Sequence, residues 1–138
     1  MRADVFLDTN VLLYAISTAR DEAPKKRIAR ELLAQPDWGL SVQVIQEFYV
    51  NATRAAPRPA MSHADAVAAI HEFLKRPVAT SDLSLLLAAL ELKAEYQLSY
   101  WDAAIVAAAS SLDAGTLYSE DLNDGQSYGS VKVRNPFV

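Results

Sequence analysis

The sequence has no cysteine, and it contains only two histidines and four glycines. Without cysteine the chain cannot form a disulfide framework, a thiolate zinc site, an iron–sulfur cluster or a thiol nucleophile, and we expect a reducing compartment. Long hydrophobic runs are also missing, because the longest, 85–90 and 103–109, are far shorter than the roughly 18 residues that cross a bilayer. The N-terminus has no signal-peptide pattern. These absences predict a cytoplasmic protein with no membrane segment.

The composition is that of a folded chain of moderate size. Its 138 residues suit one domain, which we expect to span 1–138. Hydrophobic residues make up 51% and charged residues 22%, which argues against intrinsic disorder. The 13 Lys and Arg residues against 17 Asp and Glu give a net charge of -4, which is atypical of a nucleic-acid coat protein. If four acids were metal ligands, the remaining surface would be neutral.

Short apolar strands alternate with helical patterns along the chain. The predicted strands are 3–7, 38–42, 78–79, 116–118 and 131–133. The predicted helices are 11–16, 25–34, 44–53, 66–74, a long helix that Ser81 or Asp82 caps and that reaches 96, and 103–112. Ser62 and Ser99 have the spacing of helix N-caps, and Gly115 is expected to end the last helix. The prolines at 55–59 predict a loop, and the last strand alternates as an exposed strand does. The alternation predicts parallel β-α units in a three-layer sandwich.

Two of the predicted strands end in acidic residues. Asp8 follows the first strand directly, and Asp121 comes shortly after 116–118. Asp102 lies in the first turn of the helix before that strand, and Glu47 lies in the helix predicted at 44–53. Ligands of open parallel sheets gather at the carboxyl ends of the strands, so the fold could bring these acids together.

Each of these acids also has a local explanation. Asp8 and Asp102 fit helix N-termini, where a carboxylate caps the helix or interacts with its positive end. Asp121 lies in a polar loop in which Asp and Asn bond their own backbone. Glu47 lies nearly opposite the apolar stripe of its helix, so a solvated side chain is the default there.

Three segments in chain order carry a resemblance to a known family. They are VFLDTNVLLY at 5–14, YWDAAIVAAA at 100–109 and YSED at 118–121, with QEF at 46–48 between the first two. Together they resemble the PIN-domain ribonucleases, and within them the VapC-type toxins of bacterial toxin–antitoxin pairs, over nearly the whole chain. The resemblance implies an α/β fold, a PIN-like three-layer α/β/α sandwich with a mostly parallel central sheet. It also implies a homodimer and a cognate antitoxin whose tail covers the active cleft.

The resemblance also assigns site residues. The positions that match the family's catalytic, metal-binding acids are Asp8, Glu47, Asp102 and Asp121, and the polar positions that match around them are Thr9, Asn10 and Ser119. The last loop varies within the family, so Glu120 and Asp124 are alternatives to Asp121.

Four carboxylates in one crevice repel each other, and burial raises their pKa values unless cations compensate. Oxygen ligands favour Mg²⁺ or Mn²⁺, with coordination positions left for water and phosphate oxygens. The expected reaction is hydrolysis of RNA phosphodiester bonds by a metal-activated water, which leaves a 5′-phosphate and a 3′-hydroxyl. His63 and His71 lie away from the strand ends, which disfavours a ribonuclease that uses paired histidines.

RNA that approaches an acidic cleft needs positive charge nearby. The candidate phosphate contacts are Lys25, Lys26, Arg27, Arg30, Arg54 and Arg58. A solvated helix face is the alternative explanation for the first four.

Two other classes of protein compete with a nuclease. A phospho-receiver module also has acids at strand ends, but it needs paired acids after the first strand and a lysine near the site, whereas Thr9 follows Asp8 here. A catalytically silent PIN-like module that only binds another protein is the second alternative, and the presence of all four acids argues against it.

Overall fold

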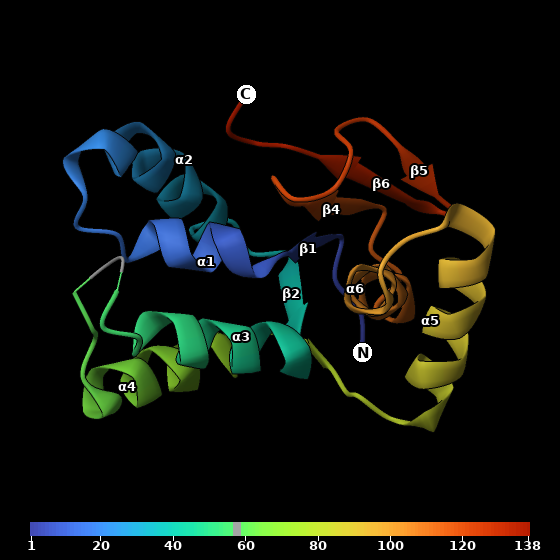
Figure 1. Ribbon diagram of the computed structural model, residues 1–138, viewed down its shortest axis with the longest axis horizontal. Coiled ribbons are helices and arrows are strands. Elements are labelled where there is room, and N and C mark those ends of the chain that lie inside the picture. Colours follow the sequence, from blue (N-terminus) through green and yellow to red (C-terminus); the bar gives the residue numbers. More distant parts are fainter. Residues whose placement is uncertain (57–58) are drawn as a thin grey trace.

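The computed structural model describes residues 1–56 and 59–138, and in these residues the chain forms six α-helices, one 3₁₀ helix and six β-strands (Figure 1). In chain order the elements are β1 (Val5–Leu7), α1 (Thr9–Ala15), η1 (Arg20–Glu22), α2 (Ala23–Leu33), β2 (Trp38–Ser41), α3 (Val42–Ala52), α4 (His63–Phe73), β3 (Val78–Ala79), α5 (Leu83–Tyr96), α6 (Tyr100–Ser111), β4 (Thr116–Tyr118), β5 (Ser127–Tyr128) and β6 (Val131–Arg134). The predicted loop at 55–59 includes residues 57–58, which lie outside the described part.

The strand order is β3-β2-β1-β4-β6-β5, and every neighbouring pair is parallel except β5 and β6. From the central strand β1, the chain first builds the sheet outward through β2 and β3, and it then returns to add β4 on the other side of β1. The register pairs Leu7 at the end of β1 with Tyr118 at the end of β4. This reversal of strand order is where parallel sheets bind ligands, and Asp8 and Ser119 follow the two strand ends.

Helices cover both faces of the sheet. In Figure 1, α1 to α4 lie on one side of the strands and α5 and α6 on the other, which confirms the predicted α/β/α sandwich. The alanine-rich segment 103–109 of α6 is buried throughout. Small side chains let this helix approach the sheet closely, and α5 then packs outside it.

The predicted N-caps Ser62 and Ser99 are confirmed, and the helices after them begin at His63 and Tyr100, three residues before the predicted starts at 66 and 103. The side chains of Ser41, Ser62, Asp82 and Ser99 each accept a hydrogen bond from a backbone N–H in the first turn of the helix that follows. These bonds satisfy amide groups that have no partner inside the helix. Local sequence chemistry therefore fixes where these four helices begin.

The C-terminal part differs from the sequence prediction in three ways. Asp113, with φ of 57°, takes the left-handed conformation after α6, a role we had expected for Gly115. The last strand lies inside the sheet between β4 and β5, and Val131 and Val133 are fully buried. The two-residue strand β5 was not predicted, because it is too short to show alternation.

Within residues 1–56 and 59–138, no helix is long and apolar enough to cross a bilayer.

Gly39 in β2 packs closely against Leu112 and Pro77, and a substitution there tests this packing. A Cβ atom at this position would lie 2.8 Å from Leu112 Cδ1 and 2.9 Å from the Pro77 carbonyl oxygen. We therefore expect Gly39→Ala to lower the free energy of unfolding by about 1–3 kcal/mol, as overpacking does, measured by urea denaturation. Gly115→Ala is the control, because an added Cβ there meets nothing within 4 Å. Equal stability of the two variants would contradict the packing seen at Gly39.

Candidate active site

Asp8 is held at the junction of β1 and α1. The buried strand delivers it directly to the N-terminus of α1, where its Oδ1 accepts a hydrogen bond of 2.7 Å from the Thr9 amide. Its Oδ2 accepts a second hydrogen bond of 2.7 Å from Ser119 Oγ, which follows β4. The residue is only 6% exposed. Asp8 therefore caps a helix and also bridges the carboxyl ends of two neighbouring strands.

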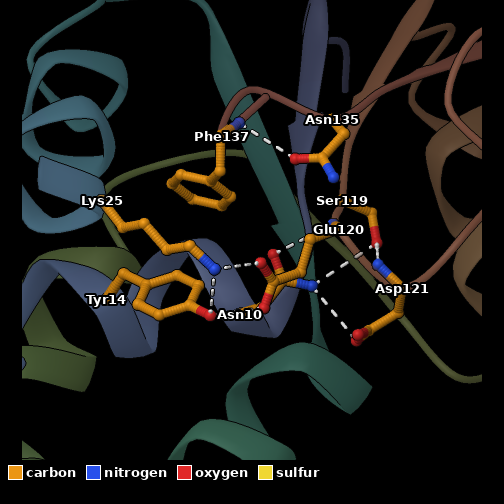
Figure 2. A network of polar contacts seen from close by, with 8 residues as sticks. All are labelled: Asn10, Tyr14, Lys25, Ser119, Glu120, Asp121, Asn135 and Phe137. Carbon is orange, nitrogen blue, oxygen red and sulfur yellow. Dashed lines mark hydrogen bonds and ion pairs between the residues drawn. The ribbon is translucent and has the colours of Figure 1, made fainter. Parts of the chain in front are cut away.

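Asp121 shares the partner Ser119 with Asp8, and Figure 2 shows how Ser119 and Asn10 hold Asp121. Its backbone N–H donates to Ser119 Oγ at 3.1 Å, and its Oδ2 accepts a hydrogen bond of 3.2 Å from Asn10 Nδ2. Asn10 Nδ2 also lies 3.4 Å from Ser119 Oγ. The predicted polar residues Asn10 and Ser119 thus connect the two acids.

Glu47 reaches the same region from α3. Thr9 Oγ1 donates to Glu47 Oε1 at 2.6 Å, and Gln43 Nε2 donates to Glu47 Oε2 at 3.4 Å. Gln43 Nε2 also donates to the Trp101 carbonyl oxygen at 3.3 Å, which connects α3 to the start of α6. The polar face of α3 is therefore turned toward the other acids rather than toward open solvent.

Gln43 is a site residue that the sequence analysis missed. It is buried, and it precedes Glu47 by one helical turn on the same face of α3. Side chains at this spacing are neighbours on a helix, so the i, i+4 pair Gln43 and Glu47 was a signal that could have identified it.

Asp102 occupies the first turn of α6. Its backbone N–H donates to the N-cap Ser99 Oγ at 3.1 Å. Burial raises the pKa of the Asp102 carboxyl, the hydrogen bond with Ser99 lowers it, and the negative charges of Asp121 and Glu47 raise it further. Asp102 therefore faces the same charges as Asp8.

The pKa of Asp8 rises from 3.8 to about 6. Burial is the largest cause, the hydrogen bonds from Ser119 and Thr9 oppose it, and the charges of Asp121 and Glu47 add to it. Across residues 1–56 and 59–138, no lysine or arginine forms an ion pair with Asp8, Glu47, Asp102 or Asp121. The four carboxylates thus act on one another near the carboxyl ends of β1 and β4, and no cation among the described residues pairs with them.

The two alternative loop acids point elsewhere. Glu120 binds Tyr14 and Lys25, and Asp124 Oδ1 accepts a hydrogen bond of 2.9 Å from the Asn135 amide. Of the loop acids, Asp121 is the one whose charge acts on Asp8 and Asp102. The geometry favours Asp121 as the fourth member of the candidate site.

The candidate phosphate contacts lie in different settings. Lys25 is paired with Glu120, and Arg30 Nε donates to the Ala15 carbonyl oxygen at 3.0 Å. The other residues of this set within the described part are Lys26 and Arg27 on α2 and Arg54 after α3, and Arg58 lies outside the described part. Their contact with RNA stays a prediction.

The acids fit a divalent cation by their chemistry, although not as a preformed cage. In the described ranges, no three Asp, Glu or His side chains lie close enough together, as they stand, to hold one ion. Mg²⁺ does not need such a cage, because it commonly binds one or two carboxylates and keeps several waters. The acids therefore suit a divalent cation such as Mg²⁺, because they supply hard oxygen ligands and negative charge that the cation would offset.

Comparisons with known proteins agree with this architecture. The family model for the PIN domain matches residues 5–123. The structure is similar to a toxin–antitoxin complex from Klebsiella pneumoniae, with a TM-score of 0.70, 19% identity, and coverage of 96% of this chain and 97% of that chain. It is also similar to Mycobacterium tuberculosis VapC20, described as a sarcin–ricin loop cleaving toxin, with a TM-score of 0.63, 20% identity, and 83% and 88% coverage.

A third similar structure is the DNA-bound VapBC from Salmonella typhimurium, with a TM-score of 0.68, 15% identity, and 99% coverage of both chains. No curated protein matches the chain in sequence. At these identities the solved structures establish a common fold.

The buried charge of Asp8 predicts a stabilising substitution. Because its pKa in the folded protein is about 6, against an ordinary value of 3.8, the carboxyl favours folding when protonated, and that contribution is lost as the pH rises through 6. In EDTA, Asp8→Asn should raise the free energy of unfolding at pH 7.5 by up to about 3 kcal/mol. Urea denaturation at pH 7.5 and pH 4 checks this, since the gain should shrink at the lower pH. A gain that is the same at both pH values would refute the charge explanation.

Proposed function

Because the chain belongs to the PIN domain family, we propose that it is a Mg²⁺- or Mn²⁺-dependent endoribonuclease that hydrolyses RNA phosphodiester bonds with an activated water. The observation that supports this proposal is that Asp8 and Asp102 each lie within the electrostatic reach of Asp121 and Glu47, where the strand order reverses between β1 and β4, and that no cation among the described residues pairs with these acids. A fold match alone would not carry it, because one fold hosts many functions.

In this proposal the four acids hold the ion, and the polar residues around them orient the acids. Asp8, Glu47, Asp102 and Asp121 are the proposed ligands. When bound, Mg²⁺ or Mn²⁺ would activate the attacking water and offset the charge that develops on the phosphate. Two hydrogen bonds orient the Asp8 carboxylate and leave lone pairs on both oxygens, and the hydroxyl of Thr9 orients Glu47.

The structural neighbours support a narrower role. Several of them are toxin–antitoxin complexes, so we propose that this chain is the toxin of such a pair and that it binds a cognate antitoxin. One neighbour is named for cleaving a ribosomal RNA loop, which supports RNA as the substrate class. The cytoplasm, where RNA is accessible, is the proposed location.

A second copy of the chain is the proposed occupant of an apolar face on α5. The leucine stripe, which we define as Leu83, Leu86, Leu87 and Leu90, is exposed and has the i, i+3, i+4, i+7 spacing of a helix that packs on another helix. Trp101, 65% exposed, borders a groove of about 450 Å³ that Leu83 and Leu86 also line. A self-complementary stripe suits a two-fold dimer, in which the same patch is used twice.

The nuclease proposal predicts that Asp102→Asn abolishes RNA cleavage, with a loss of at least about 100-fold, because one ligand of the ion is removed. Asp65→Asn is a matched control: Asp65 also lies in the first turn of a helix, and its N–H also donates to an N-cap serine at 3.1 Å. Cleavage of total cellular RNA and of purified ribosomal RNA, with Mg²⁺ or Mn²⁺ and with EDTA, is the measurement. If Asp102→Asn remained active, Asp102 would be only a first-turn acid that interacts with the positive end of α6.

The competing hypothesis is a catalytically silent PIN-like or receiver-like binding module. Its support is that no three acids within the described ranges are arranged to hold one ion directly. A wild-type protein that cuts neither RNA preparation with either ion would favour this hypothesis, and loss of cleavage in EDTA would exclude it.

The dimer proposal predicts that Leu87→Glu converts a dimer into a monomer, because it places a charge in the middle of the leucine stripe. Leu74→Glu is the control, since Leu74 is an exposed leucine at the end of α4. Light scattering coupled to size-exclusion chromatography measures the mass of each variant. A wild-type protein that is monomeric at high concentration would rule out this use of the stripe.

A further inference from the structure

A second polar cluster adjoins the four acids and contains Glu120, the residue before Asp121 (Figure 2). Tyr14 Oη donates to Glu120 Oε1 at 2.5 Å, and Lys25 Nζ lies 3.1 Å from Glu120 Oε2 and 3.1 Å from Tyr14 Oη. We call Tyr14, Lys25 and Glu120 the Lys25 cluster. Its three members come from α1, α2 and the loop after β4, so it ties together three separate segments.

Two aromatic rings lie close to the ammonium group of this cluster, and the Lys25 side chain remains 40% exposed. Lys25 Nζ lies 4.8 Å from the centroid of the Tyr14 ring and 5.8 Å from that of Phe137. The two rings meet edge to face, with centroids 4.9 Å apart. A cation between aromatic faces gains electrostatic stabilisation, and Tyr14 itself is buried. The cluster is therefore better fixed than an exposed surface ion pair.

The Lys25 cluster is connected to the candidate ligands through the backbone. The Glu120 N–H donates to Asn10 Oδ1 at 3.4 Å, while the other end of the Asn10 amide binds the Asp121 carboxylate. Asp121 is exposed, and its bond of 3.2 Å from Asn10 is longer than either of the two 2.7 Å bonds that hold Asp8. The direction in which Asp121 points thus depends on how Glu120 and Asn10 hold the loop.

We propose that the Lys25 cluster is a positioning device that holds the loop after β4, so that Asp121 faces Asp8 and Asp102. The cluster also neutralises Glu120, which keeps this fifth carboxylate out of the acid site. In this role Lys25 acts through Glu120, and this role replaces the phosphate contact that the sequence analysis predicted for it. The effect of this positioning on catalysis rests on the proposed function. The position of the loop after β4 does not, because it is a property of the protein without ion or RNA.

Hydrogen exchange of the metal-free protein tests the positioning directly. Lys25→Met removes the ion pair and keeps most of the side-chain length, and Glu120→Ala removes the acceptor of both hydrogen bonds. The matched controls are Lys75→Met and Glu72→Ala, which break another Lys–Glu pair, at the end of α4. We expect amide exchange in 119–123 to speed up at least about 10-fold in the first two variants, with exchange in α5 unchanged. Unchanged exchange in 119–123 would overturn the proposal.

Steady-state cleavage separates positioning from direct contact with RNA. Misplacement of a catalytic group by about 1 Å can cost 100-fold in rate, so we expect kcat to fall about 10- to 100-fold in Lys25→Met and Glu120→Ala with KM unchanged. The double variant should be no worse than either single one, and Lys25→Arg should recover part of the activity.

A Lys25 that binds a phosphate directly gives a different pattern. Lys25→Met would then raise KM and lower the salt dependence of binding by about one counterion, while Glu120→Ala would leave both unchanged. That pattern would overturn the proposal. If the wild-type protein cleaves no RNA, the proposed function fails, but hydrogen exchange still decides whether the Lys25 cluster positions the loop.

Discussion

The burial of Asp8, and in part of Asp102, close to other carboxylates near the carboxyl ends of β1 and β4 is the constraint on which the rest of the site depends. The strand reversal places Asp8 and the loop with Asp121 side by side, and α3 and α6 add Glu47 and Asp102. Hydrogen bonds from uncharged groups orient these side chains without cancelling their charge. The fold therefore keeps a concentration of negative charge that is unfavourable for its own stability, as functional sites often do.

The local and the functional explanations of the acids are compatible. Asp8 is an N-cap, as its position suggested, yet its second carboxylate oxygen accepts a hydrogen bond from a residue that is distant in sequence. Asp102 and Asp65 occupy equivalent first-turn positions behind serine N-caps, but Asp102 is partly buried and faces the charges of two acids from other elements, and both effects raise its pKa. What distinguishes Asp102 from Asp65 is therefore its surroundings in the fold.

The sequence predicted those parts of the structure that depend on neighbours along the chain. Short apolar runs and serine caps located β1, β4 and the starts of α4 and α6, because strand patterning and capping are local effects. Glu47 was assigned through family resemblance only, since the helical pattern of α3 placed it on the solvent side. Its true environment depends on packing against the start of α6, through Gln43 and the Trp101 carbonyl. The hydrophobic periodicity of α3 gives no indication of its contact with α6.

The same reasoning explains why the Lys25 cluster could not be predicted. Lys25 and Glu120 are 95 residues apart, and each has a plausible local explanation as a solvated charge. Their contact exists because α1 packs against α2 while the loop after β4 passes beside α1. The two halves of the acid site thus have different supports: Asp121 is held by Asn10 and Ser119 next to the Lys25 cluster, whereas Glu47 is held by Thr9 and by Gln43, which contacts the start of α6. A change in the Lys25 cluster would therefore act first on Asp121, and a change at Gln43 would act first on Glu47.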